Sequence, residues 1–237
     1  MLWEEDKKNQ PYVVPDSIAD LVFKIDCKQI ALDHAHDLSQ ALMEALPWLA
    51  EEEKAGVHMI HGASTGNGWQ RPEAGDSGGF IHLSKRSKMH IRLPKERYED
   101  VNSLIGKTIK VGDSEITFGD YQIKPFTPLG TLFSRYILLL EKETEDQFVQ
   151  RVAEEMKSMG INLKKALCGT GDEFILPEGK VRTASIMVAD LDPHEAVFLQ
   201  QQGIGEGRKM GFGLFIPHKG INPVGDMSEQ SHFSGTE

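Results

Sequence analysis

The chain has few cysteines and lacks any long run of apolar residues. Its two cysteines among 237 residues, Cys27 and Cys168, lie far apart and form no CxxC pair, which argues against a disulfide framework or a cysteine-based zinc site. No apolar run approaches the roughly 20 residues that cross a bilayer, and the first residues, MLWEEDKKNQ, lack the apolar core of a signal peptide. We therefore expect a cytoplasmic protein with no membrane partner.

An excess of positive charge is also missing. The 26 Lys and Arg residues face 36 Asp and Glu, and the net charge of −10 argues against a general nucleic-acid binder. The charge is uneven, however, because residues 81–98 hold six basic side chains and one acidic one. A basic segment on an acidic protein suggests a polyanion bound at one place, unless these cations simply pair with nearby acids at the surface.

The hydrophobic pattern predicts one order of elements, β-α-β-β-α-β, twice in succession. This is the order of the ferredoxin-like motif, in which helices cover one face of a four-stranded sheet. The first unit has strands at 18–30, 57–64 and 80–93, a helix over 38–49, a second helix from Pro94 and a last strand or hairpin; the second has strands at 131–141, 161–168, 181–191 and 213–217, with helices over 148–159 and from Asp192.

We therefore predict an α+β fold of tandem ferredoxin-like modules. The N-terminal module spans 18–122 and the C-terminal module spans 123–221. The polar ends, 1–17 and 222–237, are expected to be flexible and disordered, respectively.

Two helix starts carry capping signals. Asp37 followed by Gln40 resembles a capping box at the start of the first helix. For the last helix, Asp192, Pro193 and Glu195 fit the N-cap, N1 and N3 positions.

The stretch IHLSKRSKMHIRLP, 81–94, alternates between apolar and polar residues. One face carries Ile81, Met89 and Ile91, and the other carries the cations Arg86, Lys88 and Arg92. Lys85 interrupts the apolar side, so a turn or bulge is expected there. A strand with one cationic face can lie along a phosphate backbone; the alternative is an edge strand protected by charge against aggregation.

A second basic segment, GIGEGRKMGFGLFIPHKGI at 203–221, contains six glycines around Arg208 and Lys209. It does not match a dinucleotide-binding loop, because Arg208 stands where G-x-G-x-x-G requires glycine and because a helix precedes and a strand follows. The glycines would let the backbone approach a polyanion closely while the two cations neutralise it. A glycine turn feeding an edge strand explains two or three of these glycines, but explains six less well.

Several histidines are candidates for chemistry. His34 and His36 lie between the first strand and the first helix, where a helix N-terminus favours a neutral imidazole that can act as a general base. They could also be ordinary loop residues, or metal ligands with Asp33 and Asp37, although HxH without a clear third ligand is a weak signal.

Another histidine pair and a Gly-rich loop leave alternatives open. His58 and His61 would face opposite sides of a strand, one buried and one exposed. Trp69 and Arg71 could stack on a base or merely anchor the loop.

Together these features resemble the RAMP superfamily and, within it, the "Cas six" family of CRISPR-associated endoribonucleases that process repeat RNA, in the branch from myxobacterial-type systems. The resemblance spans roughly 18–221. It is carried by the tandem modules, the histidine at the first helix, and the glycine loop ending in G-F-G before LFIPHKGI. Supporting stretches are DLVFKIDCK, VHMIHGASTGNGW, LSKRSKMHIRLP and RTASIMVADL.

The resemblance implies an enzyme that binds CRISPR repeat RNA and cuts precursor CRISPR RNA once per repeat, without metal or cofactor. The ribose 2′-hydroxyl would attack the adjacent phosphate, leaving a 2′,3′-cyclic phosphate and a 5′-hydroxyl. His34 would be the general base, with His36 beside it; the family often adds a Tyr and a Lys, and the missing Tyr leaves the general acid unassigned. The expected RNA contacts are Ser84, Lys85, Arg86, Lys88, Arg92, Gly205, Gly207, Arg208, Lys209, Gly211, Gly213 and Lys219.

Two alternatives stay open. A noncatalytic RAMP protein that holds guide RNA among other subunits of a CRISPR effector complex would share the fold and the loop, but would not need the His34/His36 pair. A ferredoxin-like enzyme acting on a small molecule or through a metal would need EDTA-sensitive activity and would not bind RNA.

Overall fold

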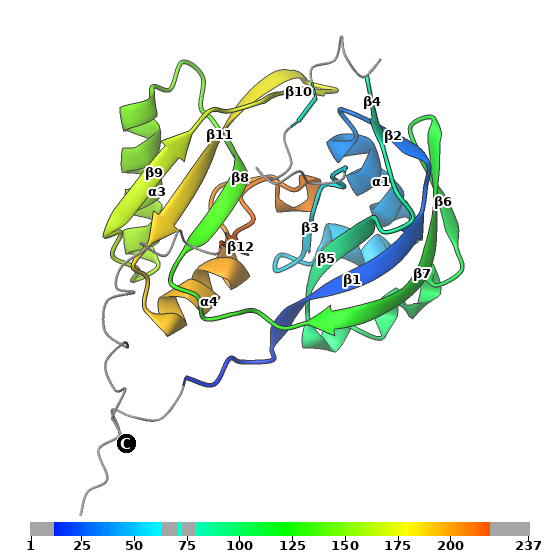
Figure 1. Ribbon diagram of the computed structural model, residues 1–237, viewed down its shortest axis with the longest axis horizontal. Helices are drawn as coiled ribbons and strands as arrows, with labels where there is room; N and C mark the ends of the chain where they lie inside the picture. Colours follow the sequence, from blue (N-terminus) through cyan, green and yellow to red (C-terminus); the bar gives the residue numbers. More distant parts are fainter. Residues whose placement is uncertain (1–11, 63–70, 73–78, 219–237) are drawn as a thin grey trace, which may run out of the picture.

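The computed structural model describes residues 12–62, 71–72 and 79–218. Two modules lie side by side, and the Gly-rich segment near residue 210 lies between them (Figure 1). Each module holds an antiparallel sheet whose strand order follows the ferredoxin-like pattern. The predicted α+β tandem is therefore the observed fold.

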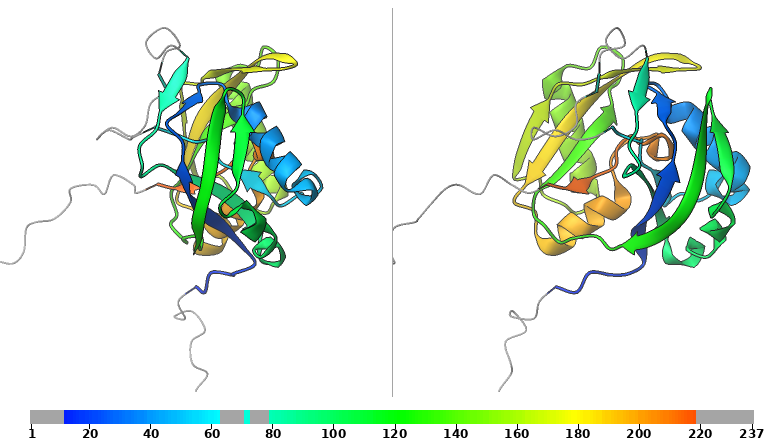
Figure 2. Two further views of the ribbon diagram at one scale, coloured as in Figure 1. Left: turned by 90° about the vertical axis from the view of Figure 1, so that its right-hand side faces the viewer. Right: turned by 45° about the vertical axis from the view of Figure 1, so that its right-hand side comes forward.

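The N-terminal module is built on a five-stranded sheet of order β3-β5-β1-β7-β6. The central strand β1 is almost entirely buried, because β5 and β7 flank it and helices cover the sheet. Figure 2 shows helix α1 and the short helical turns after β5 on the same side of this sheet. The strands are β1 (Ile18–Asp26), β3 (Gly56–Val57), β5 (Lys88–Pro94), β6 (Thr108–Val111) and β7 (Ser114–Lys124), with α1 at Ala35–Ala45.

Several predicted elements of this module differ in the structure. The second helix is two short 3-10 helices, η3 (Lys95–Arg97) and η4 (Asp100–Leu104). Of the strand expected at 57–64, only Val57 lies in a described strand, β3; the chain then runs on irregularly to Gly62, and 63–64 lie outside the described residues. The expected break near Lys85 is present: β4 (Phe80–His82) pairs with β2 (Gln29–Ala31) in a separate ribbon before the chain turns into β5.

The capping box predicted for the first helix is wrong. Helix α1 begins at Ala35 with His34 as its N-cap, so Asp37 and Gln40 already lie inside the helix. The prediction for the last helix is right: Asp192 and Glu195 form a reciprocal capping box, and Pro193 opens the first turn.

The C-terminal module has strand order β10-β11-β8-β12, and β9 pairs with the far half of β11. The strand predicted at 181–191 is β11, whereas β10, which forms a hairpin with it, is not among the predicted strands. Both helices begin with capping boxes, from Thr144 and Gln147 in α3 and from Asp192 and Glu195 in α4. The elements are β8 (Leu132–Leu138), α3 (Glu145–Ser158), β9 (Lys165–Gly169), β10 (Glu173–Leu176), β11 (Gly179–Ala189), α4 (Pro193–Gln202), η5 (Arg208–Met210) and β12 (Ile216–Pro217).

The two modules share apolar packing. The core of the N-terminal module includes three aromatic residues from the C-terminal one, namely Tyr136, Phe174 and Phe212. Phe174 meets both of the others edge to face, with ring centroids 5.0 and 5.3 Å apart. The modules are thus joined by buried surface as well as by the chain between them.

Candidate functional site

An open cavity of about 710 Å³ lies where the two modules meet. Its cations come from separate elements: Arg86 and Lys88 at the start of β5, Lys124 at the end of β7 and Arg135 on β8. Such a concentration of positive charge in one concave surface attracts anions despite the acidic total. The apolar part of the wall is made by Met59, Phe126, Leu129, Leu214, Ile216 and Pro217.

The turn before β5 presents its cations to solvent. Ser84 closes this turn: its carbonyl accepts from Ser87 N–H at 2.9 Å and its Oγ accepts from Arg86 N–H at 3.2 Å. Lys85, Arg86 and Lys88 are exposed around it, and Arg86 and Lys88 also line the cavity. We call residues 84–88 the basic turn.

The prediction that Arg92 contacts RNA from the same cationic face is wrong. Its side chain is fully buried, and its Nε and Nη2 donate to the two carboxylate oxygens of Asp20 at 2.7 and 3.2 Å. The burial arises because the end of α4 and the segment before β12 cover this face of β5, where Gln200 O and Phe215 O accept from the guanidinium. Arg92 is therefore not available to RNA.

The Gly-rich segment also differs from its prediction. Gly203, Gly205, Gly207, Gly211 and Gly213 all have positive φ, between 68° and 90°. The tightest is Gly213, where a Cβ would lie 1.9 Å from the carbonyl oxygen of Ile204. Gly203 and Gly213 are thus required by close packing of the protein's own backbone, because a Cβ at Gly203 would likewise lie 2.6 Å from Gly213 O, whereas Gly205 has positive φ with room around it.

The cations of this segment bind carbonyl groups of the protein. Arg208 donates to the carbonyls of Gln201 (2.8 Å) and Gln202 at the end of α4, and to Lys54 O (3.2 Å) in the N-terminal module. Lys209 donates to Ala50 O. Both side chains therefore bind the protein itself and do not point out as the predicted RNA contacts. Lys219, the other cation predicted to contact RNA, lies outside the described residues.

His34 is buried, with 2% of its surface exposed, and both ring nitrogens are engaged. Its Nδ1 lies 2.7 Å from Ala31 O, and its Nε2 accepts Ile60 N–H at 3.0 Å. Because a carbonyl can only accept and an amide N–H can only donate, these partners select the neutral tautomer with the proton on Nδ1. Burial lowers the pKa of His34 to about 4.

Of the neighbours of His34, Asp33 is bound to another protein group. His36 is half-buried in the first turn of α1. Asp33 forms an ion pair with Arg71 at 2.5 Å, and the Arg71 guanidinium lies 4.2 Å from the centre of the Phe174 ring. Arg71 therefore anchors its loop to both modules, whereas Trp69 is outside the described residues.

Three other histidines line the cavity or its edge: His58, His61 and His90. His58 and His61 were expected on opposite sides of a strand; the irregular backbone after β3 places both on the cavity wall instead. Burial, together with neighbouring positive charge, lowers the pKa of His61 to about 3 and that of His90 to about 4. All three are neutral near pH 7, because burial also lowers the pKa of His58 more than Asp20 raises it.

The C-terminal module adds Arg135 and Tyr136 to the cavity. The ring of Tyr136 lies 6.1 Å from that of His61, and burial raises the pKa of its hydroxyl. Sequence reasoning missed both residues, although a cation inside the apolar run TLFSRYILLL was a usable signal. Consecutive residues of a regular strand point to opposite faces, but the register of β8 against β11 shifts between Ser134 and Ile137. This irregularity lets both Arg135 and Tyr136 border the cavity.

Within 12–62, 71–72 and 79–218, no cluster of three or more His, Cys, Asp or Glu side chains is placed to hold a metal ion. None of the helices in this described part has the length and apolar content that crossing a bilayer demands.

Comparison with known proteins agrees with the fold and with the resemblance. The family model described as Cas6 Crispr matches residues 19–220. The CRISPR-associated endonuclease Cas6 of Myxococcus xanthus (strain DK1622) is 26% identical over 200 residues, 84% of this chain and 80% of that protein.

Among solved structures, a CRISPR associated protein Cas6 is similar with a TM-score of 0.61 and 15% identity, over 85% of this chain and 100% of that one. A RAMP protein described as binding different RNA substrates gives 0.55 and 13%, over 84% of this chain and 98% of that one. At these identities the structures show the shared fold. The match over residues 19–220 shows that the chain belongs to the Cas6 family.

Proposed function

We propose that this protein is an endoribonuclease that binds CRISPR repeat RNA and cleaves precursor CRISPR RNA within each repeat. The observation that carries the proposal is the cavity between the modules, lined by cations from both modules and by neutral histidines. Two similar proteins support the same function. The Cas6 of Myxococcus xanthus is named an endonuclease, and the RAMP protein is described as binding different RNA substrates.

The RNA backbone would enter along the basic turn. Lys85, Arg86 and Lys88 are exposed and belong to one short segment, so they can follow consecutive phosphates of a single strand. Lys124 and Arg135 stand on the other elements of the cavity and would hold the next phosphate. The apolar wall beside them suits an unstacked base.

We propose cleavage by attack of the ribose 2′-hydroxyl on the adjacent phosphorus, with no metal ion. The new P–O2′ bond replaces the P–O5′ bond, and products are a 2′,3′-cyclic phosphate and a 5′-hydroxyl. A general base removes the 2′-hydroxyl proton, an acid protonates the leaving 5′-oxygen, and cations stabilise the added charge on phosphorus. Guide RNA released in this way would pass to other subunits of an effector complex.

The general base has two candidates with different geometry. His34, with His36 beside it, is the one that the resemblance implies, and its Nε2 would take the proton once the Ile60 N–H bond is released. His90 lines the cavity directly and is half-buried. A histidine with a pKa of about 4 is neutral at pH 7, so both can accept a proton.

A cleavage assay in EDTA tests the reaction and assigns the base. The wild type should cut repeat RNA in EDTA, and should not cut RNA carrying a 2′-deoxy nucleotide at the cleavage site. His34→Ala, His36→Ala and His90→Ala are compared under single-turnover conditions, with circular dichroism as the check on folding. The base is the histidine whose loss lowers the rate by about 100-fold or more in a folded protein.

Two outcomes would contradict the proposal. Tight binding of repeat RNA without cleavage would favour the noncatalytic guide-RNA subunit. Activity that EDTA abolishes, in a protein that does not bind RNA, would favour a metal-dependent enzyme acting on a small molecule.

A further inference from the structure

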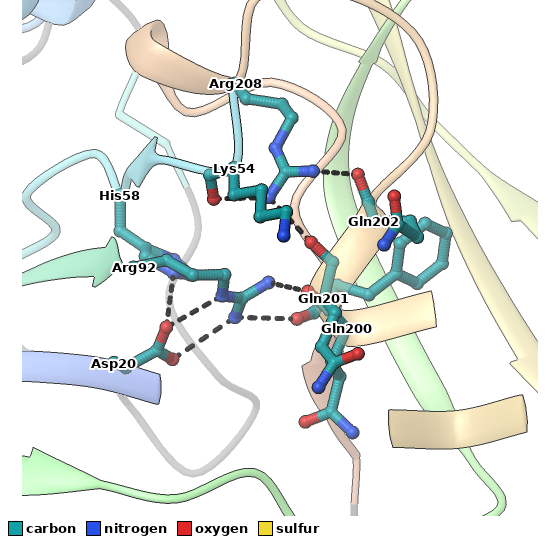
Figure 3. A network of polar contacts seen from close by, with 9 residues as sticks. Asp20, Lys54, His58, Arg92, Gln200, Gln201, Gln202 and Arg208 are labelled. Atoms are coloured by element: carbon teal, nitrogen blue, oxygen red, sulfur yellow. Dashed lines mark hydrogen bonds and ion pairs between the residues drawn. The ribbon is translucent and has the colours of Figure 1, made fainter. Parts of the chain in front are cut away.

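The buried guanidinium of Arg92 joins four separate parts of the chain. Besides Asp20 on β1, it donates to Gln200 O (2.5 Å) at the end of α4 and to Phe215 O (3.1 Å) before β12. The ring of Phe126, in the connection between the modules, lies 4.7 Å from its central carbon. One side chain of the N-terminal module thus contacts three segments that follow β7. Figure 3 shows its guanidinium between Asp20 and Gln200.

The end of α4 is the shared target of two arginines. Arg92 takes the carbonyl of Gln200, and Arg208 takes those of Gln201 and Gln202 while also reaching Lys54 O. The last carbonyls of a helix lack partners within the helix and carry its negative dipole end, so two guanidinium groups there are electrostatically favourable. Figure 3 shows Arg92 from β5 and Arg208 from the Gly-rich segment both extending toward Gln200, Gln201 and Gln202.

The same network reaches the cavity. Asp20, the carboxylate partner of Arg92, lies 3.6 Å from Nε2 of His58, and both residues line the cavity. Asp20 and Arg92 face each other directly in the register of β1 and β5, so the ion pair is built into the sheet. A shift of α4 relative to β5 would therefore alter the wall that carries His58 and His90.

Resting on the function proposed above, we infer that Arg92 is a positioning residue for the cleavage site. It binds no RNA itself. It fixes the C-terminal module against β1 and β5, and so sets the distance across the cavity between the cations of the two modules. A displacement of about 1 Å between reacting groups can lower a rate about 100-fold.

The chain offers a matched control within one module. Arg151 on α3 also makes a two-oxygen ion pair, with Glu143, and donates to Leu138 O at 2.9 Å. Its partners all belong to the C-terminal module. Removing Arg151 and Glu143 tests the loss of a comparable ion pair that does not join the modules.

The test compares Asp20→Asn/Arg92→Met with Glu143→Gln/Arg151→Met. Each double substitution avoids leaving an unpaired buried carboxylate, which would unfold the protein for unrelated reasons. Spin labels on Lys28→Cys and Leu167→Cys, in a background with Cys27 and Cys168 replaced by serine, report the distance between the modules without RNA. Both labelled positions are exposed. Single-turnover cleavage and RNA affinity are measured in parallel.

We expect Asp20→Asn/Arg92→Met to broaden the distance distribution and to lower the cleavage rate about 100-fold, with RNA affinity changed less than threefold. Arg92→Lys, which keeps the charge but not the fork, should recover part of the rate. The control should change neither distance nor rate. A wild-type distance distribution in Asp20→Asn/Arg92→Met, or a broadened one with a cleavage rate within threefold of wild type, would overturn the inference. Absence of cleavage by the wild-type protein would instead refute the proposed function. The distance measurement would then still decide whether Arg92 fixes the two modules against each other.

Discussion

Two basic segments of similar composition have opposite surroundings in this molecule. The basic turn, 84–88, holds its cations in solvent at the mouth of the cavity. The Gly-rich segment, 203–213, turns Arg208 and Lys209 onto backbone carbonyls of the protein. In the sequence, both segments consist largely of small residues and cations, so composition alone does not distinguish the exposed cations from the bound ones.

The difference arises from what each segment must connect. The basic turn joins β4 to β5 and closes through its own hydrogen bonds, from Ser87 N–H and Arg86 N–H to Ser84, while its cations stay exposed. The Gly-rich segment follows α4 and passes between the modules, so it meets the last carbonyls of that helix and those of the segments before β3. Buried carbonyls need donors, and arginine and lysine supply them there.

The largest expected effect tests whether the glycines serve packing. Gly213→Ala should destabilise the protein by about 3–5 kcal/mol, because the residue has φ of +68° and a Cβ would clash with Ile204 O. Gly205→Ala is the matched control, since it has similar φ but its Cβ would lie 3.7 Å from the nearest atom, Ile137 Cγ2; it should cost about 1 kcal/mol. Urea unfolding of both variants measures the difference, and equal costs would contradict the packing explanation.

The pH dependence of stability tests the buried histidines without any mutation, because only groups whose pKa changes on folding contribute to it. His34 has a pKa of about 4 in the folded protein against about 6.5 when unfolded, so the unfolded state binds more protons between these values. The stability that this difference contributes is full above pH 6.5 and falls by roughly 3 kcal/mol as the pH drops toward 4. The pKa values of His61 and His90 are lowered in the same direction, so these residues add to the loss of stability in acid. Between pH 6.5 and pH 4, the unfolding free energy of His34→Asn should therefore fall by about 3 kcal/mol less than that of the wild type. An equal fall in both proteins would show that His34 does not contribute.

Arg208→Met should lower the free energy of unfolding by about 2 kcal/mol, because buried carbonyls at the end of α4 lose their donor. RNA affinity, measured by fluorescence anisotropy on the folded fraction, should change less than twofold. A fall in affinity of tenfold with unchanged stability would instead make the Gly-rich segment an RNA contact.

The smallest effect concerns the basic turn. Arg86→Ala/Lys88→Ala should weaken binding of repeat RNA about tenfold, and should reduce the slope of log K against log salt by about 1.4, for two lost phosphate contacts to a single strand. Thermal stability should stay the same, because both side chains are exposed. An unaltered salt dependence would show that phosphates bind elsewhere.

Local signals were enough to predict several elements. The capping residues Asp192, Pro193 and Glu195 act within one helical turn, and the alternation in 18–30 reports directly on the buried strand β1. The first helix begins earlier than predicted, with His34 at the N-cap position. The His34 ring is held by Ala31 O and by Ile60 N–H, and Ile60 lies 26 residues away. A sequence motif around Asp37 cannot include Ile60, so local sequence could not predict this contact.

The candidate site was harder to predict because its parts converge from both modules. Arg86 and Lys88 follow from alternation along one strand, but the burial of Arg92 depends on Gln200 and Phe215, more than 100 residues later. Tyr136 and His61 likewise meet only through the docking of the two modules. Spacing within a segment cannot report on such pairs.

The place of Phe212 in the fold has a consequence for biosynthesis. This residue, close to the end of the described chain, is buried in the core of the N-terminal module, together with Tyr136 and Phe174. A nascent chain emerges from the ribosome N-terminus first, so its first module is made long before the side chain that completes its interior. The cavity can acquire its final walls only after Leu214, Ile216 and Pro217 have been translated, and a product terminated before them would lack this part of the wall.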